Sequence, residues 1–515
     1  METDEVEEAV HMFGAAARRV REGGMDGVEL AVGLGYLFAE FLSEEGNERT
    51  DKYGGSTLEE RMTFLYDVVD EVRKELGPDL ILGVRLFDDL VDYSLRLDDL
   101  WEIAPLLEAT GVLDYFNAWQ GIALAEHKGI TGHLPSYYYE PGQFAYLAGG
   151  IKEVVSLPVI GAGRIDSPAL AEQLIQEGKM DMVGMARALI ADPHLPNKAR
   201  DGRADDIRYC IACTQSCVGH IYLGMGVGCI YNPVTGRERE WGEVVPASLK
   251  KKVVVVGGGP AGMEAARVAA ERGHRVVLFE KGRRLGGQVN IVMKTPKRES
   301  FEEIILFFER QLPKLGVEVR TSQAAGVEEV LVEEPDAVVI ATGSTPLRPA
   351  IPGADGKNVV STWDVLMDTA EVGERVVVVD TQGRPEASTV AEYLADMGKR
   401  VEVVTGLQYV GREITPPVWH HLTERLLKKG VRLTPLTGVF EVLEDSLYVY
   451  STVTWEPGYI EGVDTVVFAA GGQAEDELYH QLKGKVSELH AIGDCYQPRD
   501  IEVAVVDGHR VAVEL

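Results

Sequence analysis

The chain has 515 residues, of which 82 are acidic and 51 are basic, and its formal net charge is −31. This excess of negative charge argues against nucleic acid and against anionic membranes as partners. No apolar run approaches the ~18 residues of a membrane span and no signal peptide is visible, so we expect a cytoplasmic protein of several domains.

The first 205 residues alternate between short apolar runs and amphipathic stretches. Residues 60–76, for example, have the spacing of an amphipathic helix. Such alternation predicts a parallel sheet with helices between its strands, here of the (β/α)8 barrel type. The expected strands cover residues 26–30, 80–86, 114–118, 158–163 and 181–186.

Four of the five cysteines fall within twenty residues, as Cys210, Cys213, Cys217 and Cys229. Four thiolates this close in sequence can hold one metal centre. Three clustered ligands and one distant ligand favour a [4Fe–4S] cluster over a zinc ribbon, which usually pairs two CxxC knuckles. A zinc site and a pair of disulfides remain as alternatives.

A dinucleotide-binding motif follows the cysteines. The apolar strand 252–256 runs into Gly257, Gly259 and Gly262, which have the G-x-G-x-x-G spacing, and then into a helical pattern. These glycines would form the tight turn, the approach to a pyrophosphate and the close helix–strand contact. The next strand ends at Glu280, where a carboxylate can accept a ribose hydroxyl.

A second nucleotide domain is expected over residues 371–465, but its phosphate turn has changed. The strand 375–380 leads into a turn that keeps only Gly383 of the three glycines. Asp380 places a negative charge where a pyrophosphate would approach, so we expect the fold to persist while the NAD(P) site is degenerate.

The glycine motif and two later motifs carry a resemblance to a family. GGGPAGMEAA, ATGSTP and AIGDC resemble the FAD-domain signatures of the flavoproteins with two dinucleotide-binding domains. This resemblance implies that FAD, or at least its ADP portion, binds at the glycine motif, with Gly343, Gly493 and Asp494 as further contacts.

The segment before the cysteines resembles the old yellow enzyme family, in the branch of 2,4-dienoyl-CoA reductase and trimethylamine dehydrogenase. The matching text is GMDGVELAVGLGYLFAEFLS, NERTDKYGGS, GVRL, PVIGAGRI and VGMARALIADPHLPNKAR. The same branch carries this cysteine spacing and then the FAD domain. It also implies that the segment is only the C-terminal portion of the barrel, so we expect a partner chain to complete it or the gene model to be truncated.

The resemblance further implies FMN in the barrel. Arg85 would lie beside the flavin pyrimidine ring. The phosphate would be bound at the ends of the last two strands, where a barrel presents backbone N–H groups and arginines. The implied phosphate-site residues are Gly163, Arg164, Gly184, Ala186 and Arg187.

The implied catalytic residues depart from the usual pattern. Tyr36 matches the proton-donating tyrosine of ene-reductases, but Ala31 and Leu34 replace the side chains that hydrogen-bond a substrate carbonyl in many old yellow enzymes. The dienoyl-CoA reductases also lack that pair and use a histidine from a later loop. His127 and His133 are the candidates here.

These observations predict an iron–sulfur flavoprotein oxidoreductase that acts on a small organic molecule. We expect it to resemble the amine dehydrogenases and demethylases, with an electron-transfer flavoprotein as a candidate partner and a homo-oligomeric state. An NAD(P)H-dependent enoyl reductase and a non-catalytic electron-transfer subunit that needs a partner chain are the alternatives.

The expected domain organisation follows from the motifs. A partial barrel covers residues 1–205, and an iron–sulfur segment with a linker covers 206–245. The FAD or ADP domain covers 246–370 and is completed by 466–515. The second nucleotide domain, 371–465, is inserted within it.

Overall fold

The computed structural model describes residues 1–90, 94–121 and 127–515, and the side chains of residues 127 and 128 lie outside the described part. The chain folds into two compact units, Met1–Ala188 and Leu189–Leu515. The division between the two units falls inside the predicted barrel segment 1–205, whose bounds stay a prediction.

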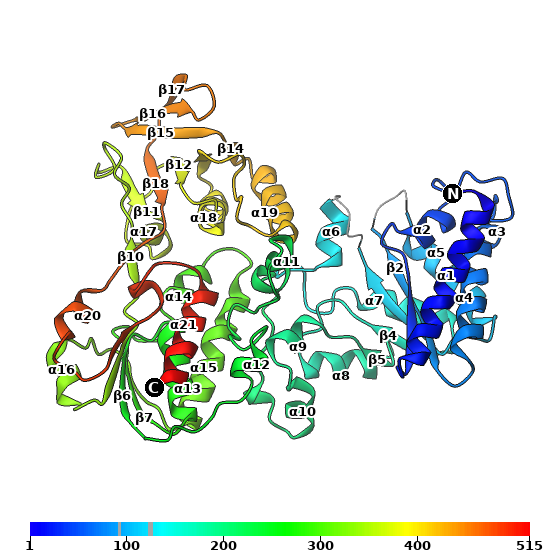
Figure 1. Ribbon diagram of the computed structural model, residues 1–515. Coiled ribbons are helices and arrows are strands. Elements are labelled where there is room, and N and C mark those ends of the chain that lie inside the picture. The colour runs from blue at the N-terminus through cyan, green and yellow to red at the C-terminus, as the bar shows by residue number, and fades with distance from the viewer. Residues whose placement is uncertain (91–93, 122–126) are drawn as a thin grey trace. The chain divides into compact units, whose positions relative to one another are not determined.

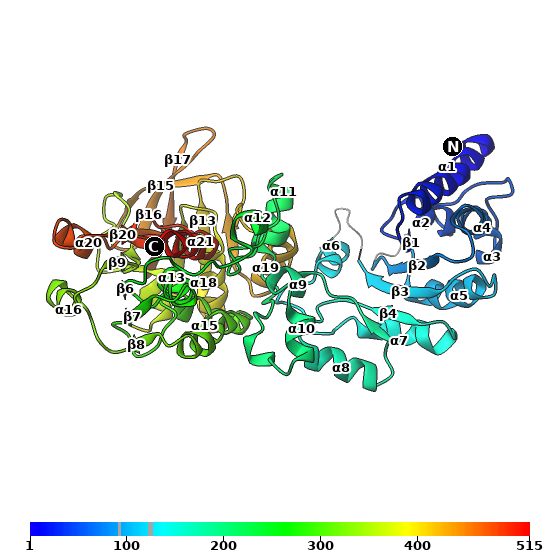
Figure 2. The same cartoon turned by 60° about the horizontal axis from the view of Figure 1, so that its bottom comes forward.

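The first unit is built on a five-stranded parallel sheet whose strands follow one another in chain order (Figure 2). The structure confirms the predicted parallel sheet, and β1 and β5 form its edges. The strands are β1 (Gly27–Val32), β2 (Ile81–Asp88), β3 (Tyr115–Gln120), β4 (Val159–Gly161) and β5 (Met182–Val183).

Helices connect these strands because the chain between them repeats apolar side chains at helical spacing. In α4, for example, Phe64, Val68 and Val72 are buried on one face while the opposite face is polar. Before and between the strands lie α1 (Thr3–Glu22), α2 (Leu37–Leu42), α3 (Leu58–Arg61), α4 (Thr63–Leu76), α5 (Leu97–Glu108), α6 (His127–His133), α7 (Ala145–Val154) and α8 (Pro168–Gln176). The last helix, α9 (Arg187–Ala191), begins in this unit and ends in the second.

The second unit contains the predicted FAD-type domain, a parallel sheet of order β20-β9-β6-β7-β8. Its strands are β6 (Lys252–Val256), β7 (Arg275–Phe279), β8 (Glu318–Arg320), β9 (Ala337–Ile340) and β20 (Leu489–Ala491). The long helices of this domain are α13 (Pro260–Glu271), α15 (Glu302–Lys314) and α21 (Ile501–Glu514). Helices α13 and α21 lie side by side (Figure 1).

A second parallel sheet has the order β11-β18-β12-β13-β14. Two of its strands, β11 (Val359–Ser361) and β18 (Thr465–Ala469), reach beyond the predicted range 371–465. The other strands are β12 (Arg375–Asp380), β13 (Arg400–Thr405) and β14 (Arg432–Thr434), and the helices are α17 (Thr362–Leu366), α18 (Pro385–Asp396) and α19 (Pro416–Lys428).

Smaller elements complete the second unit. A three-stranded antiparallel sheet contains β15 (Thr437–Val442), β16 (Ser446–Ser451) and β17 (Pro457–Glu461), and β10 (Ser344–Pro346) pairs with β19 (Gly472–Ala474). The short helices are α10 (Leu195–Arg200), α11 (His220–Tyr222), α12 (Glu238–Trp241), α14 (Val289–Val292), α16 (Val327–Val332) and α20 (Glu477–Leu482). Within the described residues, no helix combines the length and the apolar character needed to cross a membrane.

Candidate functional site

Arg85 lies on β2 and is held by an ion pair. Its Nη2 atom is 2.5 Å from Oε1 of Glu29 on β1, and Oε2 of Glu29 also accepts from the Tyr115 hydroxyl and the Asn117 amide. The Arg85 guanidinium stacks on Trp119, 5.4 Å from the ring centroid. Its buried Nε atom has no hydrogen-bond partner among the described residues, so a donor is left for a bound ring.

His133 lies near Trp119, the same tryptophan on which Arg85 stacks. No sequence pattern marked Trp119 as part of a site. The His133 ring is 6.4 Å from the Trp119 ring. Burial lowers the pKa of His133, so its imidazole is neutral at neutral pH. The buried Nδ1 atom has no partner in the part of the chain that the structure describes. His127 begins α6, but its side chain is outside that part.

The predicted phosphate-binding residues lie where β4 and β5 end. The backbone N–H of Gly184 donates to the carbonyl of Gly161, which joins the two strand ends, and Gly163 has a positive φ of 113°. Burial raises the pKa of Asp166, and the positive charges of Arg164 and Arg187 oppose this. Arg164 and Arg187 are therefore near enough to act on this carboxyl, and guanidinium groups are the usual partners of a phosphate.

The remaining predicted phosphate-site residues, Ala186 and Arg187, follow β5. Ala186 immediately precedes Arg187, the first residue of α9. One guanidinium nitrogen of Arg187, Nη1, is buried and has no hydrogen-bond partner within the described ranges. These positions fit the phosphate site that the resemblance implies, and their role stays a prediction.

Tyr36 is presented by a turn that depends on Asp89. Tyr36 is 50% exposed and precedes α2. The carboxylate of Asp89, at the end of β2, accepts from the backbone N–H groups of Leu34 (2.7 Å) and Gly35 (3.2 Å) and from the Ser94 hydroxyl (2.6 Å). Leu34 has a φ of 63°, a left-handed conformation that these contacts stabilise.

The burial of Asp89 predicts a pH-dependent stability. Burial raises its pKa from the usual 3.8 to about 6, which corresponds to about 3 kcal/mol. The stabilisation is fully present below about pH 4, where the group is protonated in both states, and is lost as the pH rises through about 6. Thermal unfolding should therefore show a fall in stability over this range that Asp89→Asn flattens. The exposed control Asp79→Asn should keep the wild-type slope, and an unchanged slope in Asp89→Asn would contradict the assignment.

In the second unit, backbone hydrogen bonds gather the cysteine segment. The N–H of Gly228 donates to the carbonyl of Ser216, which brings the distant Cys229 back toward Cys217. The N–H of Ala212 donates to Sγ of Cys210.

The four thiols influence one another. Burial is the main cause of the raised pKa of Cys213, and the charges of Cys217, Cys229 and Cys210 add to it. Among the described residues, no three His, Cys, Asp or Glu side chains converge on a single metal ion. The four ligands of a [4Fe–4S] cluster bind separate irons and need no such convergence, so the cluster stays a prediction.

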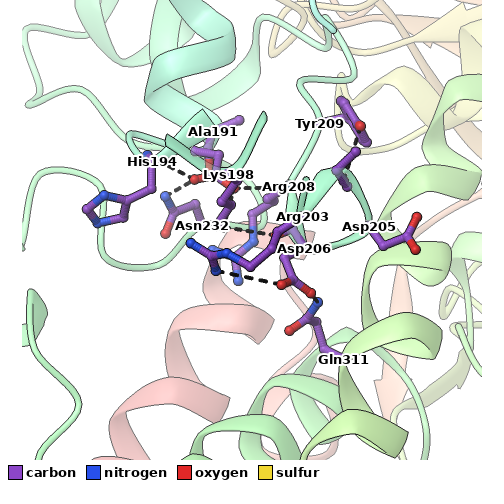
Figure 3. A network of polar contacts seen from close by, with 12 residues as sticks. Ala191, His194, Lys198, Arg203, Asp205, Asp206, Arg208, Tyr209, Asn232 and Gln311 are labelled. Carbon is purple, nitrogen blue, oxygen red and sulfur yellow. Dashed lines mark hydrogen bonds and ion pairs between the residues drawn. The ribbon is translucent and has the colours of Figure 1, made fainter. Parts of the chain in front are cut away.

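Two neighbouring residues, Ala191 and Asp192, anchor the two ends of this segment at Arg208 and Asn232, and Figure 3 shows Ala191, Arg208 and Asn232. Oδ2 of Asp192 accepts from Nζ of Lys198 (2.5 Å) and from the backbone N–H of Arg208 (2.9 Å). The Asn232 side chain donates to the carbonyl of Ala191 at 3.0 Å. Because Arg208 precedes the first cysteine and Asn232 follows the last one, the same anchor fixes both ends.

The glycine turn of the FAD-type domain has the predicted geometry. Gly257 has a φ of 112°, and a Cβ atom on Gly262 would lie 1.9 Å from the carbonyl oxygen of Gly257. Gly259 is different, because a Cβ atom there would meet no protein atom within 4 Å. The turn is therefore closed by protein at Gly262 and open at Gly259, where a pyrophosphate would approach the N-terminus of α13.

Glu280 is oriented by the same turn. Its Oε2 atom accepts from the N–H of Gly258 at 2.8 Å, and Oε1 accepts from the N–H of Gly282 at 2.5 Å. Each carboxylate oxygen can accept a further hydrogen bond, so this geometry fits a ribose hydroxyl.

Asp494 is held by side chains that the sequence did not reveal. Its Oδ2 atom accepts from the Gln288 amide (2.8 Å) and from the Ser344 hydroxyl (3.1 Å). Gly343 and Gly493 both have a positive φ, of 85° and 62°. The residues after β9 and β20 thus meet the loop of Gln288, as expected for one binding site at the ends of neighbouring parallel strands.

Substitutions at Gly262 and at Gly259 should have opposite effects on protein stability and on nucleotide binding. Gly262→Ala should destabilise the second unit by about 2 kcal/mol or more, because its Cβ overlaps backbone that cannot move away. Gly259→Val should leave the stability of the nucleotide-free protein close to wild type and abolish retention of the nucleotide, measured by cofactor extraction. Full nucleotide content in Gly259→Val would show that the site is elsewhere.

In the second nucleotide domain, the turn after β12 is filled by the side chain of Asp380. Oδ1 of Asp380 accepts from the N–H groups of Gln382 (3.0 Å) and Gly383 (2.7 Å), and only 3% of Asp380 is exposed. These are N–H groups of the kind that bind a phosphate in an intact turn. The Asp380 carboxylate therefore lies where the phosphate of a dinucleotide would bind.

Comparisons with known proteins agree with this architecture. The model of the NADH:flavin oxidoreductase / NADH oxidase family matches residues 1–206, and that of pyridine nucleotide-disulphide oxidoreductases matches 251–508. A metal reductase of Desulforamulus reducens and an N,N-dimethylglycine/sarcosine dehydrogenase of Chromohalobacter salexigens are each 35% identical over 99% of this chain, which covers 80% and 79% of them. A solved 2-naphthoyl-CoA reductase is 34% identical with a TM-score of 0.92, over 100% of this chain and 77% of that one.

The chain belongs to the NADH:flavin oxidoreductase / NADH oxidase family. It is a flavoprotein oxidoreductase with an FMN-type barrel domain and an FAD/pyridine-nucleotide-type domain, which confirms the predicted fold class and the predicted type of enzyme.

Proposed function

We propose that this enzyme is an amine dehydrogenase or demethylase. In the reaction the neutral amine loses a hydride from the carbon next to nitrogen and becomes an iminium ion. Water hydrolyses this ion to an aldehyde, the dealkylated amine and a proton, and the two electrons of the hydride leave to an electron-transfer flavoprotein. When bound, FMN would accept the hydride, a [4Fe–4S] cluster would pass single electrons, and FAD or its ADP portion would bind the nucleotide domain.

Residues of the chain fit each of these groups. Arg85 and the strand ends near Arg164 and Arg187 would hold FMN, and Tyr36 and His133 are the proposed groups that move a proton. Gly259 and its neighbours would hold the pyrophosphate. The similarity to N,N-dimethylglycine/sarcosine dehydrogenase supports a small secondary or tertiary amine as the substrate.

The cluster has a direct test. Anaerobically purified protein should contain about four irons per chain with matching acid-labile sulfide. Cys213→Ser should lose most of this iron because a buried ligand is removed. Cys495→Ser is the matched control, since Cys495 is also buried but lies beside Thr342 in the nucleotide domain, and it should keep its iron. Stoichiometric zinc without sulfide would contradict the cluster.

The contacts of Asp380 carry the proposed direction of electron flow. A dinucleotide at this turn would have to displace a buried carboxylate from two backbone N–H groups and then lie against its negative charge. This cost weakens binding of NADH and NADPH at the second domain and favours oxidation of an organic substrate with transfer of electrons to a protein.

Rapid mixing distinguishes the two directions. NADH or NADPH at micromolar concentration should reduce the bound flavin slowly or not at all, whereas a methylated amine such as dimethylglycine or sarcosine should reduce it within seconds. The absorbance of the oxidised flavin is the measurement. Fast reduction by NADH with micromolar half-saturation would contradict the proposal.

A variant at Asp380 tests whether its carboxylate keeps phosphate out of this turn. Asp380→Gly leaves the N–H groups of Gln382 and Gly383 without their acceptor and should cost about 1–3 kcal/mol of stability. Inorganic phosphate should then raise the unfolding temperature of this variant but not that of wild type. Glu402→Ala also removes a largely buried carboxylate, which accepts from Thr434, and phosphate should not restore its stability.

An NAD(P)H-dependent enoyl reductase is the second candidate, and the position of His133 favours it. A neutral, buried imidazole near Trp119 could donate a hydrogen bond to a substrate carbonyl, which Ala31 and Leu34 cannot do with their side chains. The similarity to 2-naphthoyl-CoA reductase is in line with this reading. The same mixing experiment separates the two candidates.

A further inference from the structure

We infer that Arg208 is a positioning residue for the four-cysteine centre, whose buried positive charge raises the reduction potential of that centre. The inference rests on the proposed [4Fe–4S] cluster. Arg208 has a different task from the cysteines, because it binds no iron and acts through its charge and its packing.

Arg208 lies between the two ends of the cysteine segment. It is two residues before Cys210, and its guanidinium lies 5.7 Å from the ring centroid of Tyr231, which is two residues after Cys229. The guanidinium also lies 4.3 Å from the ring centroid of Phe307 on α15. With only 9% of its side chain exposed, Arg208 is a cation enclosed by aromatic rings.

The charge of Arg208 is only weakly compensated. The nearest carboxylate, Glu264 on α13, already forms two short contacts with Arg267, at 2.8 and 2.7 Å, and accepts from Nδ1 of His509 at 2.9 Å. Nη2 of Arg208 is 3.8 Å from the same carboxylate. Within the ranges that the structure describes, the buried Nε of Arg208 has no hydrogen-bond partner.

The charge of Arg208 lies beside both ends of the cysteine segment, so it acts on a centre held there. Iron–sulfur potentials depend on net charge, on hydrogen bonds to the sulfurs and on solvent exposure. Reduction adds one negative charge to such a centre, so a fixed cation in a poorly screened interior stabilises the reduced form more than the oxidised form.

The test compares variants by iron and sulfide content and by a redox titration of the cluster followed by electron paramagnetic resonance. Arg208→Gln should keep its iron and shift the one-electron equilibrium at least tenfold toward the oxidised form, a fall in midpoint potential of about 59 mV. Arg208→Lys keeps the charge and should restore most of the shift. Arg310→Gln removes a more exposed arginine of the same unit and should leave the potential unchanged because solvent screens its charge.

A second variant, which should shift the midpoint potential in the opposite direction, keeps the inference testable if Arg208→Gln fails to assemble its cluster. Glu264→Gln removes the negative charge nearest to Arg208 at a cost in stability, and the protein that retains its iron should have a raised potential. Iron-loaded Arg208→Gln with the wild-type potential, Arg208→Lys with the same fall as Arg208→Gln, or Glu264→Gln with a lowered potential would each overturn the inference alone. Wild-type protein without iron would overturn the proposed cluster, and this inference with it.

Discussion

The second unit depends on one buried carboxylate, that of Glu264. It has no exposed surface and faces three positively charged or proton-donating groups, from Arg267 in its own helix, His509 in α21 and Arg208 in the cysteine segment. A buried charge that loses a partner is strongly destabilising, so each of these contacts constrains the others. Glu264 therefore fixes three parts of the unit together: the helix behind the glycine turn, the helix that follows Asp494, and the chain that leads into the cysteines.

The two nucleotide domains show how one turn can be open or filled within the same architecture. Both place a helix after a buried parallel strand, and both helices begin with proline after the turn. At Gly259 the space before the helix is free of protein, whereas at the second turn the carboxylate of Asp380 binds the backbone N–H groups. A helix N-terminus attracts an anion in either case, and the sequence decides whether the anion is a ligand or a side chain.

Local patterns explain what could be predicted from the sequence. The five strands of the first unit, the glycine turn and the degenerate second turn each depend on residues that are close together in the chain, so spacing and hydrophobic periodicity reveal them. Contacts between distant segments leave no such pattern. Trp119 joins Arg85 and His133, Gln288 reaches Asp494, and β11 and β18 extend the second sheet, all through tertiary packing. The chain between residues 189 and 205 likewise packs with the cysteine segment because Asp192 accepts from Arg208.

Unsatisfied polar atoms explain why the first unit is suited to a cofactor. Nε of Arg85, Nε1 of Trp119, Nδ1 of His133 and Nη1 of Arg187 are buried and have no partner among the residues that the structure describes. Each such atom costs about 1–3 kcal/mol, so a protein retains several of them close to its strand ends only when something compensates. A ligand that supplies the missing hydrogen bonds regains this free energy on binding and stabilises the folded chain. The proposed FMN, a polar and anionic cofactor, would supply partners of this kind to the first unit.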